Sequence, residues 1–171
     1  MKHLTLINPE NVTESEGLLY TQRIAVRAVV FDSDENVALL HAINNNYFKL
    51  PGGGVEESED FETALERECI EEIGTSVKIT EDLGSVTEYR KRYNLRQISY
   101  CYLARVQGEK GIPNLTESEI IEGFETLWVP LEEALRLVSE SKPIIYEGPY
   151  MVMRDTALLQ AALENLIQGN T

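Results

Sequence analysis

Residues 51–74 read PGGGVEESEDFETALERECIEEIG, from Pro51 to Gly74. Three glycines open this stretch and an acidic turn follows them. The pattern then predicts a helix over about residues 59–73. Ser58 and the acids of the first turn are typical of a helix start, and Gly74 is typical of a helix end.

One face of this helix changes character along its length. At about 100° per residue, the apolar stripe that starts at Phe61 continues into Glu68 and Glu72. Glu71 lies at its edge. A carboxylate on a buried face is costly without a partner, so we expect a cation there. Clustered carboxylate oxygens suit Mg²⁺, or Mn²⁺, rather than zinc.

The alternative interpretation is an acidic helix face that only meets solvent. Two features favour the metal site instead. The carboxylates share the apolar stripe, and the preceding glycines let the backbone approach a metal or ligand closely.

Strand patterns lie on both sides of this helix. Alternating or β-rich runs predict strands, and two further apolar patterns predict helices, the last of which starts at Gly148-Pro149 and ends at Gly169. The expected strands are residues 23–31, 37–42, 47–50, 77–89, 97–106 and 124–129, with a helix at 131–139. Strands 23–31 and 37–42 are expected to form a hairpin, and strands 77–89 and 97–106 a second one around a basic turn.

The order of elements has no regular βαβ repeat and no linker, so we predict one α/β domain with a mixed sheet and helices packed on it. Residues 1–20 are expected to be an irregular N-terminal arm, and residues 21–171 the domain. Residues 108–122 are expected to be an acidic loop.

The charge balance limits the partners. Fifteen basic and 29 acidic side chains give a net charge of −14, which argues against nucleic acid or an anionic membrane as the main partner. No apolar run is long enough to span a bilayer. Cys69 and Cys101 have no metal-type spacing and suggest buried, reduced thiols of a cytoplasmic protein.

The stretch from Gly53 to Thr75 resembles the Nudix box, G-x5-E-x7-R-E-U-x-E-E-x-G-U, where U is a bulky apolar residue. Every glycine and charged position matches. Cys69 is small for its apolar position, and Thr75 departs from the final one. The matching positions are Gly53, Glu59, Arg67, Glu68, Glu71, Glu72 and Gly74.

The resemblance implies a Nudix-type α/β/α sandwich and Mg²⁺-dependent hydrolysis of a diphosphate linkage. By the family pattern, Glu68, Glu71 and Glu72 bind the metal, and a carbonyl of Gly52 or Gly53 adds a ligand. Arg67 is expected to pair with Glu59 and hold helix and loop together. Glu68 is the first candidate for general base.

Further substrate-binding candidates lie outside the box. Arg27 is unusual because it stands in the middle of a strand, and Arg90, Arg92 and Tyr93 lie in or beside the basic turn. Glu119 and Glu122 of the acidic loop are candidates for a further base or ligand. For the turn and the loop, simple exposure to solvent is the alternative.

Three functions remain open. The first is a MutT-like pyrophosphohydrolase of a nucleoside triphosphate. The second is a hydrolase of dinucleoside polyphosphates or nucleotide sugars, with RNA the weakest choice because of the acidic chain. The third is a catalytically silent Nudix module that senses a ligand. The expected partner is a small nucleotide or other diphosphate, and a homodimer through the arm and the long hairpin is left open.

Overall fold

A seven-stranded mixed sheet forms the centre of the computed structural model, which describes residues 1–169. Strands β5 (Ser76–Arg90) and β6 (Leu95–Gln107) form the long antiparallel hairpin expected from the sequence. On its other edge β6 pairs in parallel with β2 (Thr21–Phe31). Strand β3 (Asn36–Ala42) pairs with β4 (Tyr47–Lys49) and with β7 (Phe124–Pro130).

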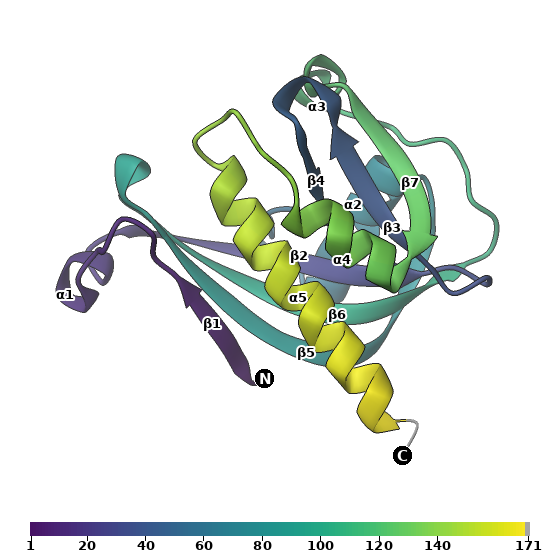
Figure 1. Cartoon of the computed structure of the whole chain (residues 1–171), viewed down its shortest axis with the longest axis horizontal. Coiled ribbons are helices and arrows are strands. Elements are labelled where there is room, and N and C mark those ends of the chain that lie inside the picture. The colour runs from purple at the N-terminus through teal and green to yellow at the C-terminus, as the bar shows by residue number, and fades with distance from the viewer. Residues whose placement is uncertain (170–171) are drawn as a thin grey trace.

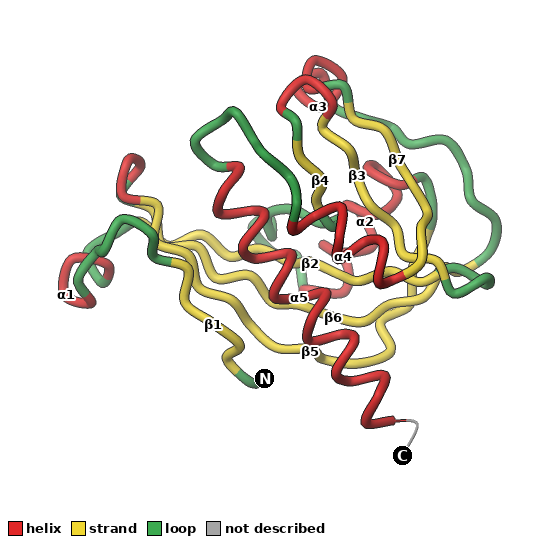
Figure 2. The backbone as a smooth tube through the Cα atoms, in the orientation of Figure 1, coloured by secondary structure: helices red, strands yellow, loops and turns green. Residues whose placement is uncertain are grey.

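Helices cover both faces of the sheet, which confirms the predicted sandwich (Figures 1 and 2). Helices α4 (Leu131–Ser139) and α5 (Gly148–Gly169) pack on one face, over a cluster that includes Val29 and Phe31 of β2. Helix α2 (Phe61–Ile73) packs on the other face, against Val26, Ala28 and Val30. Alternate side chains of β2 therefore pack into two different hydrophobic cores, one under each layer of helices.

Strands β2 and β3 separate almost at once, because only Phe31 and Val37 pair between them. The predicted hairpin is thus correct at its turn but not along its length. The gap is filled by the segment 51–55, which runs along the free edge of β2. Val26 N–H donates to Gly53 O (2.9 Å), Ala28 N–H to Pro51 O (3.2 Å), and Val55 N–H to Ile24 O (3.1 Å).

The N-terminal residues are not the irregular arm that the sequence suggested. Strand β1 (His3–Ile7) pairs in parallel with β5 at the edge of the sheet, and a short helix α1 (Glu14–Gly17) follows. The pairing joins residues about eighty positions apart, and such a partner leaves no local signal in five residues.

Two further boundaries differ from expectation. The acidic loop ends in a short helix, α3 (Glu117–Glu122), which is closed by a capping box between Thr116 and Glu119. Helix α2 begins at Phe61 with Asp60 as its N-cap, whereas Ser58 adopts φ +70° in the turn before it. Both cysteines are free and buried, as expected. Within residues 1–169, no helix is long and apolar enough to cross a membrane.

Candidate active site

Other parts of the protein occupy the space that side chains would take at Gly52 and Gly53. Gly52 has φ +127°, and a Cβ on it would lie 2.2 Å from the carbonyl oxygen of Val26. A Cβ on Gly53 would lie 2.1 Å from Glu68 Oε1. The loop is therefore pressed between the edge of β2 and the carboxylates of α2.

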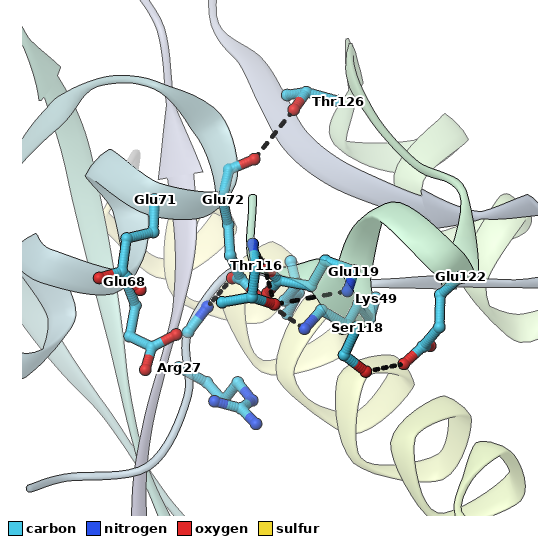
Figure 3. Close-up of polar contacts among 12 residues, drawn as sticks. Arg27, Lys49, Glu68, Glu71, Glu72, Thr116, Ser118, Glu119, Glu122 and Thr126 are labelled. Carbon is cyan, nitrogen blue, oxygen red and sulfur yellow. Dashed lines mark hydrogen bonds and ion pairs between the residues drawn. The ribbon is translucent and has the colours of Figure 1, made fainter. Parts of the chain in front are cut away.

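Glu72 is the buried carboxylate of the set, with 1% of its surface exposed. Its two oxygens are both engaged: Lys49 Nζ donates to Oε1 (2.6 Å) and Gly52 N–H donates to Oε2 (2.7 Å) (Figure 3). Burial raises the pKa of Glu72, and Lys49 opposes that rise. The cation expected on this face is thus present as a lysine side chain.

Arg67 connects the turn, the loop and the helix. Its guanidinium donates to both oxygens of Glu59 (2.8 and 3.0 Å), to Glu68 Oε1 (2.8 Å) and to Gly54 O (3.0 Å). It also lies 3.6 Å from a carboxylate oxygen of Glu71. The hydrogen bond from Arg67 lowers the pKa of Glu59 to about 2. The predicted Arg67–Glu59 pairing is present, and it orders the entrance to α2.

Glu68 and Glu71 lie side by side near the glycine loop, and each is only partly buried (Figure 3). Burial raises the pKa of Glu71; the charge of Arg67 opposes this rise, and Glu68, Glu119 and Glu56 add to it. Negative charge is therefore only partly compensated here, and a cation would be favoured.

The donor chemistry fits a hard divalent ion. Three carboxylates, those of Glu68, Glu71 and Glu72, come from the last two turns of α2 and lie beside the backbone of the glycine loop. The ligands are not preassembled. In residues 1–169 no group of three or more His, Cys, Asp or Glu side chains is arranged to hold a metal. Glu72 is engaged by Lys49, and the carbonyl of Gly53 accepts from Val26. Binding would have to draw Glu72 away from Lys49, or use Glu68 and Glu71 first.

Arg27 is held close to this site from β2. It is 5% exposed; its Nη1 donates to Val26 O (2.7 Å), and its buried Nε has no hydrogen-bond partner. Burial, and then repulsion from Arg154, lower its pKa to about 10. A buried cation with an unused donor next to the glycine loop is suited to an anionic group.

One residue of the basic turn differs from expectation, whereas Arg92 and Tyr93 are exposed. Arg90 is not exposed at a hairpin tip: it is buried and donates to Glu88 Oε2 (2.6 and 2.9 Å). Arg92 lies over the rings of Tyr93 and Tyr146, and the Tyr93 hydroxyl donates to Glu147. These contacts hold the tip against the start of α5.

Glu119 and Glu122 of α3 both have hydrogen-bond partners. Glu119 accepts from the amide and hydroxyl of Thr116, while Glu122 accepts from Asn45 (2.9 Å) and Tyr47 (3.2 Å). Glu119 is close enough to α2 for its charge to raise the pKa of Glu71.

Sequence reasoning missed three charged residues around the site. Lys49 pairs with Glu72, and Asp155 accepts from the backbone N–H of Leu50 (2.9 Å). Arg154 holds that aspartate. The available signal was a charged Arg-Asp pair between the apolar stretches 150–153 and 157–159 of one helix.

Comparison with known proteins identifies the family of this chain. The family model described as NUDIX domain matches residues 21–147. An RNA pyrophosphohydrolase of Pelagibacter ubique (strain HTCC1062) is 29% identical over 137 residues, which cover 73% of this chain and 87% of the relative.

Solved structures show the same fold. A NUDIX hydrolase from Nitrosomonas europaea gives a TM-score of 0.62 at 18% identity, over 87% of this chain and 90% of that one. The C. elegans Ap4A hydrolase gives 0.59 at 19% identity, over 85% and 99%. Because the family match spans β2 to β7, with the glycine loop and α2, the chain belongs to the NUDIX family and is a hydrolase that cleaves pyrophosphate linkages.

Proposed function

We propose that this NUDIX hydrolase is a magnesium-dependent pyrophosphohydrolase of a nucleoside triphosphate. One observation supports this most: the backbone of Gly53 lies so close to Glu68 that a methyl group between them would sit 2.1 Å from the carboxylate. Glu71 stands beside that pair on the same helix. Carboxylate oxygens thus lie against the glycine loop, where they could hold a phosphate-bound cation.

Glu68, Glu71 and Glu72, with a carbonyl of Gly53, would hold the ion. A magnesium ion held there would neutralise charge on the phosphate oxygens and lower the pKa of the attacking water. Glu68 accepts the proton of that water, because it faces the loop and is less enclosed than Glu72. Arg67 keeps Glu68 in position through its hydrogen bond.

Arg27 is proposed to contact the phosphate chain. Its Nε has no hydrogen-bond partner, and its Cα would lie 3.0 Å from a Cβ on Gly52 of the loop. Arg90 is less suited to this role because its guanidinium is committed to Glu88.

A second substrate is supported by a specific observation. The relative from Pelagibacter ubique is named an RNA pyrophosphohydrolase, so a triphosphate at the 5′ end of RNA is a candidate too. The net charge of −14 favours the free nucleotide, because a long RNA would meet a repulsive surface.

The test is a panel of substrates with purified protein. Nucleoside triphosphates, dinucleoside polyphosphates, nucleotide sugars and 5′-triphosphorylated RNA are incubated with Mg²⁺ or with a chelator, and the products are identified. We expect pyrophosphate and a nucleoside monophosphate from a triphosphate, and no product with chelator.

Glu68→Gln is expected to lower turnover by about a hundredfold or more, because the general base is removed. Glu62→Gln is the matched control, since Glu62 is exposed on the first turn of the same helix. Hydrolysis that is unaffected by Glu68→Gln would exclude the proposed base. Binding of a nucleotide without any hydrolysis would favour the silent sensor instead.

A further inference from the structure

Helix α5 carries two adjacent charged residues in the core. Arg154 and Asp155 are both 0% exposed. Arg154 donates to both oxygens of Asp155, at 2.6 and 3.0 Å, and its Nη1 lies 3.4 Å from Glu88. Replacing a buried ion pair with apolar residues is often neutral or stabilising, so stability alone does not account for this pair.

Asp155 has a second partner, the backbone of the glycine loop. Its Oδ2 accepts the N–H of Leu50 at 2.9 Å. The ladder between β3 and β4 ends at the pair Leu40–Lys49, so it does not include Leu50. Asp155 therefore satisfies a buried N–H at the position where the chain leaves β4 and enters the loop.

The next N–H of the loop, that of Gly52, also donates to a buried carboxylate, but this carboxylate comes from the helix on the other face of the sheet. Pro51 has no N–H, and Gly52 donates to the buried Glu72 of α2 (2.7 Å). Two consecutive loop donors are thus held by two buried carboxylates from helices on opposite faces of the sheet. The loop is thus bound on both sides next to the place where Gly53 meets Glu68.

We propose that Asp155 is a positioning residue for the glycine loop, and that helix α5 thereby sets the affinity of the site for divalent metal. The loop part of the proposal stands on the geometry alone, whereas the metal part rests on the proposed function. The loop leaves almost no free space at Gly53, and a displacement near 1 Å is enough to impair a site that depends on aligned groups.

The test removes the hydrogen bond without leaving an unpaired buried charge. In the double variant Arg154→Met/Asp155→Leu both charges are lost together, so the core is expected to stay folded. Amide hydrogen exchange of Leu50 and Gly52 is measured by NMR, and Mg²⁺ binding by calorimetry. We expect exchange at both amides to rise at least tenfold, and the Kd for Mg²⁺ to rise by about tenfold.

Leu158→Ala is the matched control, because Leu158 is a fully buried residue of the same helix whose apolar side chain cannot form a hydrogen bond to the loop. It is expected to lower Tm while leaving the Kd for Mg²⁺ within about twofold. Asp155→Asn, which keeps one acceptor oxygen for Leu50, is expected to fall between wild type and the double variant. It also serves if the double variant does not fold.

Unchanged exchange at Leu50 and Gly52 in a folded double variant would overturn the proposal. An equal rise in Kd for Leu158→Ala would also overturn it, because the effect would then follow general stability. Wild-type protein that binds no Mg²⁺ and hydrolyses nothing would contradict the proposed function, while amide exchange would still decide whether Asp155 holds the loop.

Discussion

Glu72 and Lys49 show how a buried carboxylate can be stabilised without a metal. The helix pattern predicts that a cation must lie on this face, and the structure supplies the ammonium group of Lys49 at 2.6 Å. Lys49 also lies 4.9 Å from the centre of the Phe124 ring. The sequence could not identify this partner, because Lys49 stands twenty-three residues before Glu72 and on a different element.

Lys49→Met tests the balance between lysine and metal. We expect the variant to lose about 3–5 kcal/mol of unfolding free energy, because Glu72 becomes a buried charge without its main partner. Mg²⁺ should raise its Tm more than that of wild type, since the ion would take the place of the lysine. Thermal unfolding with and without Mg²⁺ measures both effects.

The stability of Lys49→Met should also depend on pH, and the direction follows from the raised pKa of Glu72. A carboxyl whose pKa is higher in the folded protein favours folding at low pH, and this contribution is lost as pH rises through the folded-state pKa. The variant should therefore regain stability on acidification. Lys49→Met/Glu72→Gln, which has no charge to bury, should be stable at neutral pH. If the double variant is as unstable as the single one, lost packing rather than charge is the cause.

At the scale of the elements, Arg67 joins helix α2 to the turn that precedes it. Its bond to Glu59 lowers the pKa of that carboxyl to about 2. A lowered pKa stabilises the folded state above the unfolded-state value, near 4.3, and the contribution is lost as pH falls toward 2.

Glu59→Gln is therefore expected to lower Tm at neutral pH and to have a diminishing effect as pH falls from about 4.5 to 2. The measurement is Tm against pH for the variant and wild type. Glu57→Gln, an exposed residue of the same turn, is the control. A Tm difference that stays constant to pH 2 would show that Glu59 acts by packing and not by charge.

The elements that could be predicted are those with a strong local pattern. Helix α4 has the predicted bounds, and the long hairpin differs by only a residue or two at each strand end. The site helix was recognised from its glycines and glutamates. The predicted start is too early because Ser58 and Asp60 are both good N-cap residues. In the structure Asp60 is the N-cap, and the backbone φ of +70° at Ser58 does not suit that position.

The elements that could not be predicted depend on distant partners. Strand β1 is defined by its pairing with β5, and the long separation of β2 from β3 is explained by the loop that fills the gap. Arg90 looked exposed because its neighbours in sequence are basic, whereas its partner Glu88 lies on the same face of the same strand.

At the scale of the whole molecule, three distant segments meet at Glu10. Its carboxylate accepts from the hydroxyls of Tyr146 and Tyr150 and from the backbone N–H of Lys91. The N-terminal segment, the tip of the long hairpin and the start of α5 are thereby fastened together. The two tyrosine hydroxyls contribute most to lowering the pKa of Glu10.

Glu10→Ala is expected to loosen this junction. Loss of these hydrogen bonds should lower the unfolding free energy by about 1–3 kcal/mol. The variant loses bonds to a charged carboxylate and also leaves their donors without that acceptor. For a chain of this size that corresponds to a Tm decrease of about 2–4 °C for each kcal/mol. Amide exchange in β1 should rise as well, since Glu10 lies three residues beyond that strand.

Glu14→Ala, at an exposed position of α1, is the control and should leave Tm nearly unchanged. Slow exchange in β1 of the Glu10 variant would mean that pairing with β5 holds the N-terminal segment without this junction.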